Sequence, residues 1–393
     1  MSRLLLVSCL VACASTPVSV SPTAGESSAT PEPAGSPGAG ATTPSVGAES
    51  SAPATDSGST SAPGSTSAPG STSAPATAAE GIAPLSDATR ARIAALPREQ
   101  IPLPGEYYYR SNELRHDLLV PDLRGRGGVV LGVGPDQIYT LAALMGAEMI
   151  VGVDYDARIP ALHRLYGVLV PRSETVDALI AHFAPENTEA TEALLRAELG
   201  DDLQPVRMFE RLHDQLHRYL QRLKERRPGG TPATWLADPA YYAHVRDLFR
   251  AGRVFARTGD LTGSTTVRAI GPVLRDLGLT VRVFYFSNAD QFFEYDDDFV
   301  ANARSLPTDD RTLVVRTIRH PKLPNARDDR WHYIVQDFDD LMERLDARYF
   351  RRSQVVVEEL VDAGAPWVGE GLSHITRETP RSHLERRRRR AGG

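Results

Sequence analysis

The stretch GVVLGVGPDQIYTLAALMGAEMIVGVD, residues 128–154, decides the fold. It opens with residues 129–131, a short apolar run typical of a strand buried on both faces of a parallel sheet. Gly132 and Gly134 follow, and glycines allow a tight backbone turn that a side chain would obstruct. Leucine and methionine then recur at helical spacing up to Gly146, a residue type that commonly ends a helix.

A second apolar run, residues 149–153, ends in Asp154, 20 positions after Gly134 (154 − 134). Strand, glycine turn, helix, strand and acid are the parts of a nucleotide-binding βαβ unit, in which the turn approaches the ligand and the carboxylate accepts hydrogen bonds from ribose hydroxyls. We therefore predict an α/β fold, Rossmann-like and doubly wound, with a mostly parallel sheet. The alternative is a βαβ unit whose glycines serve only packing and whose Asp154 is a solvated strand end.

The N-terminal residues 1–13 resemble a bacterial lipoprotein signal, because Arg3 precedes a short apolar segment and small residues precede Cys13. By that resemblance, cleavage leaves Cys13 as a lipidated N-terminus that anchors the protein to a membrane. The apolar segment itself is too short to span a bilayer as a helix. An ordinary secretory signal and a misplaced start codon are the alternatives.

Residues 14–80 are composed of Ser, Thr, Ala, Pro and Gly with few other residues, and residues 58–75 repeat the hexad GSTSAP three times. Such a composition buries too little apolar surface to offset the entropy of ordering, so we expect a disordered tether. Signal and tether together predict an exported, membrane-anchored lipoprotein that faces the periplasm or the cell exterior. Without a working signal the protein would be cytoplasmic.

Charge and cysteine content exclude several classes of site. Arg3 and five acidic residues precede residue 81, so the remainder holds 43 of the 44 basic and 45 of the 50 acidic residues. Without the five arginines 386–390 this remainder is mildly acidic, and we expect no specific nucleic-acid partner.

Both cysteines lie in the signal, which leaves no disulfide, thiolate zinc site or cysteine nucleophile for the folded part. His213 and His217 share a helical face but lack an identifiable third ligand, so we expect no metal site.

The folded part is expected to be one domain, residues 81–365, followed by a mostly disordered basic tail, residues 366–393. Residues 173–227 are almost continuously helix-forming, and we interpret them as a helical insertion that acts as a lid over the binding edge. The arginine run 386–390 is either a solvated tail or a segment attracted to anionic lipid, polysaccharide or nucleic acid.

Polar residues follow three of the predicted strands. Asp154 ends one strand, Asp260 lies in the turn GDLTG after another, and Ser287 and Asn288 follow the strong strand TVRVFYF. Because ligands of open parallel sheets bind outside the carboxyl ends of the strands, these residues converge on one candidate site. We take Asp260, Ser287 and Asn288 as candidate catalytic residues. The alternative for GDLTG is a turn whose aspartate caps the next helix.

Four motifs in one order resemble an uncharacterised bacterial family with the fold of class I S-adenosylmethionine-dependent methyltransferases. The resemblance covers roughly residues 105–320. The motifs are Ser111-Asn112-Glu113, LGVGPDQ (131–137), GDLTG (259–263) and FYFSN (284–288).

The resemblance implies a particular set of cofactor contacts. The residues that it places at S-adenosylmethionine are Gly132, Gly134, Asp136, Gln137, Asp154 and Asp260. Within this set the glycines lie under the amino-acid end of the cofactor, Asp154 holds the ribose, and Asp260 lies near the adenine or the methyl donor. The chain departs from the usual pattern at Val130, where methyltransferases carry an acid, and at Asp136, where they carry a third glycine.

Three functions remain open from the sequence. One is an S-adenosylmethionine-binding methyltransferase of unknown acceptor, since methyl transfer needs mainly alignment of the reacting atoms. Another is a catalytically silent, membrane-tethered domain on the same fold that binds an unknown small molecule or protein. A hydrolase at the edge formed by Asp154, Asp260 and Asn288 is the third. The expected export conflicts with the first, because the methyl donor is made in the cytoplasm.

Overall fold

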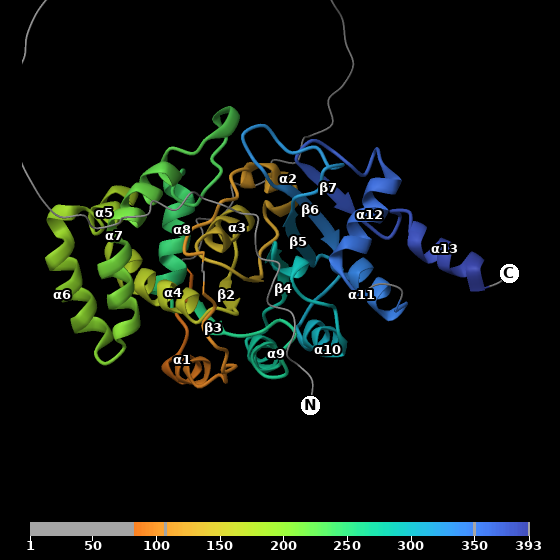
Figure 1. The fold of residues 1–393 in the computed structure, drawn as a ribbon. Coiled ribbons are helices and arrows are strands. Elements are labelled where there is room, and N and C mark those ends of the chain that lie inside the picture. The colour runs from red at the N-terminus through yellow and green to blue at the C-terminus, as the bar shows by residue number, and fades with distance from the viewer. Residues whose placement is uncertain (1–81, 106–107, 349–350, 392–393) are drawn as a thin grey trace, which may run out of the picture. The chain divides into compact units, whose positions relative to one another are not determined.

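A computed structural model of the chain describes residues 82–105, 108–348 and 351–391 (Figure 1). The expected signal, Cys13 and the tether lie outside these residues. The described part contains one seven-stranded sheet of order β3-β2-β1-β4-β5-β6-β7. Its strands are β1 (Val129–Gly132), β2 (Met149–Asp154), β3 (Val254–Thr258), β4 (Val281–Ser287), β5 (Leu313–Ile318), β6 (His332–Asp337) and β7 (Leu372–Ile375).

The sheet is mostly parallel. Strands β1 to β5 run in one direction, β6 is antiparallel to β5, and β7 is parallel to β6. The chain winds outward from β1 through β2 to β3 and then returns to place β4 on the other side of β1. This reversal is the switch point at which doubly wound sheets bind ligands, so the predicted fold class is confirmed.

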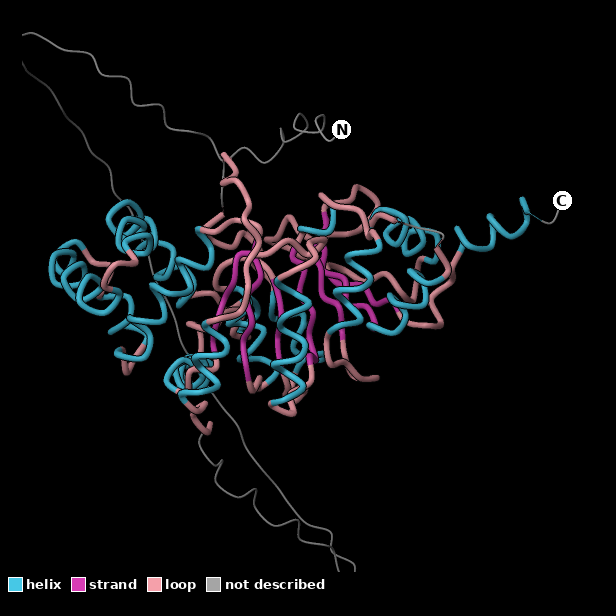
Figure 2. The backbone as a smooth tube through the Cα atoms, turned by 90° about the horizontal axis from the view of Figure 1, so that it is seen from below, coloured by secondary structure: helices cyan, strands magenta, loops and turns pink. Residues whose placement is uncertain are grey.

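Helices cover both faces of the sheet (Figures 1 and 2). Side chains alternate along β1, so that Val130 joins one core and Val129 and Leu131 join the other. The first core is completed by α3 (Gln137–Met145), α4 (Arg158–Leu169), α7 (Leu203–Lys224) and α8 (Pro239–Arg250). The second is completed by α1 (Asp87–Ala94), α9 (Thr266–Asp276), α10 (Asp297–Ser305), α11 (Phe338–Asp346) and α12 (Ser353–Ala363).

Local signals explain where several of these helices begin and end. Helix α3 stops at Gly146, which has the left-handed φ of 64° that a residue with a side chain adopts at a cost. Helix α1 begins after Ser86, whose side chain accepts a hydrogen bond from the Thr89 amide. At the start of helix α9, Glu99 accepts hydrogen bonds from the amides of Thr265 and Thr266.

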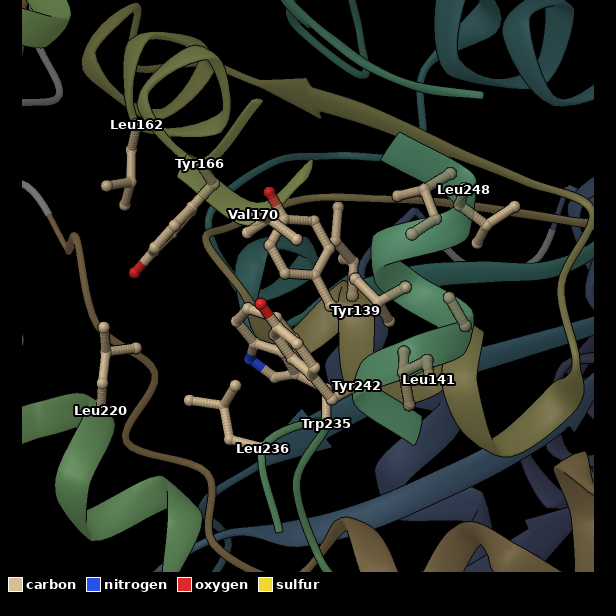
Figure 3. Close-up of a cluster of buried hydrophobic side chains, with 14 of the residues drawn as sticks. Tyr139, Leu141, Leu162, Tyr166, Val170, Leu220, Trp235, Leu236, Tyr242 and Leu248 are labelled. Carbon is tan, nitrogen blue, oxygen red and sulfur yellow. The ribbon is translucent and has the colours of Figure 1, made fainter. Parts of the chain in front are cut away.

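An aromatic cluster fills the first core where the insertion meets the sheet layer (Figure 3). Tyr139 of α3 packs edge-on against Trp235 at 5.2 Å between ring centroids and against Tyr166 of α4 at 6.0 Å. Trp235 in turn stacks on Tyr242 of α8. Large rings of this kind bury much apolar area, and Trp and Tyr then need partners for their polar atoms.

The predicted helical insertion is present as α5 (Val176–Ala181), α6 (Thr188–Leu199) and α7. It packs against α4 at the β3 side of the sheet (Figure 1). Helix α7 reaches the carboxyl edge of the sheet through Tyr219, whose hydroxyl accepts a hydrogen bond from the Ser111 amide. The insertion therefore borders the candidate site on one side.

The C-terminal region differs from the expected disordered tail. Residues 372–375 form β7, which pairs with β6 at the edge of the sheet, and residues 382–391 form helix α13 (Ser382–Ala391). A strand of this length contains too few residues for an alternating pattern to be recognised in the sequence. In the described part of the chain, no helix is both long enough and apolar enough to cross a membrane.

Candidate functional site

The glycine turn after β1 and the acid at the end of β2 meet at the carboxyl edge of the sheet. The Gly134 amide donates a hydrogen bond of 2.8 Å to Asp154 Oδ2, and the Asp156 amide donates one of the same length to Asp154 Oδ1. The third strand end joins them, since the Gly259 amide donates to the Asp154 carbonyl at 2.8 Å. We call the surface formed by Gly134, Gln137 and Asp154 the rim.

Gly134 needs to be glycine for conformation and for space. Its φ is +85°, and a Cβ at this position would lie 2.3 Å from Gln137 Nε2. The Gln137 carboxamide therefore lies directly over the turn, where it is also hydrogen-bonded to the Tyr285 hydroxyl. Its Oε1 is buried without a hydrogen-bond partner among the described residues. A buried acceptor of this kind is rare in folded proteins unless a ligand, ion or water supplies the donor.

Gly132 has a different reason for being glycine. A Cβ here would lie 2.8 Å from Tyr285 Cβ and 2.9 Å from the Tyr285 carbonyl oxygen on the neighbouring strand β4. The residue is required by the close approach of β1 and β4. The structure thus places Gly132 in sheet packing, whereas the resemblance implied contact with a cofactor.

The Asp154 carboxyl group is held in a position that disfavours its charge. Burial raises the pKa of Asp154 to about 6, although the hydrogen bonds from the Asp156 and Gly134 amides lower it. The nearby Asp156 charge adds to the increase. Asp156 is itself paired with Arg158, with 2.7 Å between Asp156 Oδ2 and the guanidinium. Further donors to Asp154 would therefore stabilise its charged form.

A buried histidine on α4 is hydrogen-bonded to the glycine turn. His163 Nε2 on α4 lies 3.1 Å from the Gly134 carbonyl oxygen, and its Nδ1 is hydrogen-bonded to the Tyr139 hydroxyl. Burial lowers the pKa of His163 to about 4 despite the bond to Gly134, so the ring is neutral at physiological pH. The arrangement fixes the tautomer, with Nε2 donating to Gly134 and Nδ1 accepting from Tyr139. In the sequence, His163 stands within a helix-forming segment and carries no motif that indicates this role.

Asp136 points away from the rim into the helical layer. It is 1% exposed, and its carboxylate accepts hydrogen bonds from the Tyr219 hydroxyl at 2.9 Å and from Trp235 Nε1 at 3.0 Å. Burial raises the pKa of Asp136, and these two bonds lower it. Asp136 thus links the start of α3 to α7 of the insertion. The resemblance had implied a contact with the cofactor instead.

A second buried carboxylate, Glu113, occupies the carboxyl ends of β4 and β5. It accepts hydrogen bonds from the Ser287 hydroxyl at 2.6 Å, from the Thr317 hydroxyl at 2.9 Å, and from Tyr285. His116 Nε2 lies 3.2 Å from the same carboxylate. Burial raises the pKa of Glu113, but the bond and charge of His116 and the bonds from Ser287 and Tyr285 hold it below its usual value.

The segment that carries Glu113 is tied to residues near the edge of the sheet. The backbone around it is fixed to the sheet edge, because the Leu114 amide donates to Asp329 at 2.9 Å and the Arg115 amide donates to the Tyr333 hydroxyl at 3.0 Å. In the sequence, the Ser-Asn-Glu motif stands out only as part of the resemblance. The sequence does not indicate that Glu113 is buried, because its hydrogen-bond partners lie far along the chain.

The three catalytic candidates occupy different surroundings. Asp260 Oδ1 accepts from the Thr262 amide and hydroxyl, both at 2.8 Å, so the carboxylate stabilises its own turn and not the next helix. Ser287 has a left-handed φ of 50° and donates to Glu113. Asn288 is half-buried at the start of the short helical turn that follows β4. The strand ends thus meet at one edge, but Asp260 and Ser287 have partners outside the rim.

Other features of the described residues lie outside the rim. No group of three or more His, Cys, Asp or Glu side chains in this part of the chain has the arrangement of a metal site. A surface cavity of about 530 Å³ lies elsewhere, between α10 and α11, and is lined by residues such as Asp297 and Arg304. Among the tyrosines that precede the Ser-Asn-Glu motif, Tyr108 is 54% exposed and the Tyr109 hydroxyl is hydrogen-bonded to Gln215 of α7.

The rim brings an acceptor and a carboxylate together in one place. Gln137 Oε1 can accept from an ammonium or hydroxyl group, and Asp154 has lone pairs left after its two backbone bonds. A ligand that carries both an amino group and neighbouring hydroxyls matches these groups. Such a site can bind and orient a ligand without proton transfer.

Comparison with known proteins gives the family and a structural relative. No curated protein matches the chain. A solved structure of the rRNA methyltransferase aviRa from Streptomyces viridochromogenes matches with 15% identity and a TM-score of 0.28, over 58% of this chain and 84% of that one. A family model described as "Domain of unknown function (DUF7790)" matches residues 108–376. These residues include every strand of the sheet, and the chain therefore belongs to this family of unknown function.

Proposed function

We propose that the rim binds S-adenosylmethionine and that the domain is a methyltransferase-like protein of unknown acceptor. The observation that carries the proposal is the contact between the Gly134 amide and the Asp154 carboxylate, beside the unpartnered Gln137 Oε1. In this arrangement Gly134 and Gln137 hold the amino-acid end of the ligand, and Asp154 accepts from the ribose hydroxyls. When bound, S-adenosylmethionine supplies a methyl group activated by its sulfonium.

The residues of the chain bind and orient this ligand. Gln137 must turn its carboxamide away from Gly134, since there is no space over the turn for even one additional carbon atom. The neutral His163 can keep the Gly134 carbonyl in place while this happens, because its bond to that carbonyl does not involve Gln137. The donors of the ligand also relieve the unfavourable charge of the half-buried Asp154.

One observation favours a second candidate, a binding domain without catalysis. Glu113 accepts hydrogen bonds from the hydroxyls of Ser287, Tyr285 and Thr317. The polar groups at the ends of β4 and β5 are therefore hydrogen-bonded to one another. An acceptor molecule would have to displace part of this cluster to reach a methyl group held at the rim. The same commitment of Ser287 gives no support to a hydrolase.

Calorimetric titration of the full chain with S-adenosylmethionine and its demethylated product tests the proposal. Micromolar binding that is lost in Asp154→Ala supports the ligand assignment, and absence of heat at millimolar ligand rejects it. The control is Asp201→Ala, at an exposed position before α7, which is expected to bind as the wild type does. Equal affinity for donor and product, without methylation of any acceptor in a cell extract, would favour the catalytically silent candidate.

We also propose that the protein is exported and anchored through a lipid on Cys13. This proposal is supported by the signal-like N-terminus and the low-complexity segment that follows it. Labelling of cells with a palmitate analogue tests it, since the wild type should incorporate the label and Cys13→Ser should not. Equal labelling of both proteins, or labelling of neither, would reject the anchor.

A further inference from the structure

Helix α13 extends from the domain and carries the run of five arginines (Figures 1 and 2). Its first turn is fixed to α12, because the Ser382 hydroxyl donates to Asp362 at 2.8 Å and the His383 amide donates to Glu359 at 2.9 Å. Arg386 adds an ion pair of 3.0 Å with Asp362. The beginning of the arginine run is thus held in a fixed position on the domain.

The remaining arginines form no ion pair with the residues that the structure describes. Arg387 donates to a backbone carbonyl, that of Arg348, at 2.9 Å, and a carbonyl carries no net charge. Residues 388–390 are exposed and make no ion pair within the described ranges. Arg348 is also exposed and adds another positive charge beside α13. We call Arg348 together with residues 387–390 the basic tip.

Helix stability does not explain this concentration of charge. Like charges three or four positions apart, such as Arg386 and Arg390, destabilise a helix by mutual repulsion. The helix dipole favours cations in the last turn, but it acts on only that turn and is weak at an exposed position. An external anionic surface would relieve the repulsion and release counterions.

We propose that the basic tip docks the domain on an anionic membrane surface. The chain from residue 81 onward is mildly acidic once the arginines 386–390 are set aside, with 38 basic against 45 acidic residues. A nucleic acid lying along the domain would meet that acidic remainder. A flat surface of anionic lipid headgroups meets the projecting tip and leaves the acidic remainder in solvent.

This role complements the proposed lipid anchor and rests on it for its location in the cell. A polybasic segment is a common second membrane signal beside a lipid anchor. A Gly/Ser-type chain as long as the tether expected at residues 14–80 would have a mean reach of about 45 Å. The two contacts together would keep the domain close to the lipid surface.

Co-sedimentation of the full, unlipidated chain with lipid vesicles tests the proposal. The vesicles are phosphatidylcholine alone or phosphatidylcholine mixed with phosphatidylglycerol, at low and high salt. Any uptake by the neutral vesicles measures the contribution of the apolar N-terminal segment. We expect binding to the anionic vesicles to exceed this baseline and to weaken with salt.

Two variants with equal loss of charge make the test specific. Replacing the four arginines 387–390 by glutamine should weaken binding to anionic vesicles by about fivefold for each arginine. Replacing four exposed arginines of the insertion by glutamine should leave binding unchanged; these are Arg207, Arg211, Arg218 and Arg222.

The proposal is overturned by any of three results. These are unchanged binding in the α13 variant, equal losses in both variants, and displacement from anionic vesicles by duplex RNA at an equal concentration of phosphate groups. The assay requires neither lipidation of Cys13 nor a ligand at the rim. Failure here is therefore distinguishable from failure of the palmitate labelling or of the calorimetric titration.

Discussion

Replacing Asp154 by asparagine should change the pH dependence of stability by a predictable amount. Burial raises the pKa of Asp154 from 3.8 to about 6 in the folded chain. The folded state therefore binds an additional proton between these two values, and the free energy of unfolding decreases as the pH rises through that window. The difference of 2.2 pKa units (6 − 3.8) corresponds to about 3 kcal/mol.

The asparagine variant lacks this titration. It also loses one hydrogen bond, because its amide nitrogen must face the amide of either Gly134 or Asp156, but that loss is independent of pH. The free energy of unfolding of Asp154→Asn relative to wild type should therefore increase by about 2 kcal/mol between about pH 4.5 and about pH 7.5. At acidic pH the variant should be the less stable of the two, since only the lost bond then counts.

Urea unfolding of both proteins across this pH range measures the difference directly. The control is Asp201→Asn, at an exposed position, whose difference from wild type should stay constant with pH. A constant difference for Asp154→Asn would show that Asp154 is solvated in the folded chain. That result would refute the claim that the rim disfavours the charge of Asp154. The ligand assignment depends on this claim.

Further predictions concern the ligand and the Glu113 cluster. Because ligand donors stabilise ionised Asp154, affinity for S-adenosylmethionine should increase with pH by up to about tenfold per unit below the pKa and level off above it; calorimetry at several pH values checks this. Gly146→Ala should cost about 1 kcal/mol in urea unfolding because of its positive φ; Gly134→Ala should cost more because its Cβ would also displace Gln137, and only this variant should weaken binding. Glu113→Gln should lower the free energy of unfolding by about 3 kcal/mol, since a carboxylate with several buried donors loses its charge, whereas Glu189→Gln on the surface of α6 should have little effect.

Much of the fold was predictable because its signals are local. The runs 129–131 and 149–153 are apolar over a strand's length, and Gly146 ends the helix between them, so β1, α3 and β2 were found close to their observed bounds. The helical insertion was also found, because its breaks at Pro185 and Gly200 interrupt an otherwise helix-forming sequence.

The site was predictable only in part because its remaining contacts join distant segments. The meeting of Gly134 with Asp154 follows from the βαβ topology. The inward orientation of Asp136 depends on Tyr219, 83 positions away in the insertion, and the spacing of the turn carries no sign of it. Glu113 bonds to hydroxyls on β4 and β5, more than 170 positions along the chain. Such pairs can be identified only when the three-dimensional arrangement of the strands is known.

Photo-crosslinking of S-adenosylmethionine to the full chain, followed by tryptic peptide mapping, tests the central claim most directly. Trypsin releases residues 127–158 as one peptide, because no lysine or arginine lies between Arg126 and Arg158. This peptide contains Gly134, Gln137 and Asp154. We predict that the label is found in it and is displaced by an excess of the demethylated product. Label confined to other peptides, or the same labelling in the presence of excess product, would contradict the account.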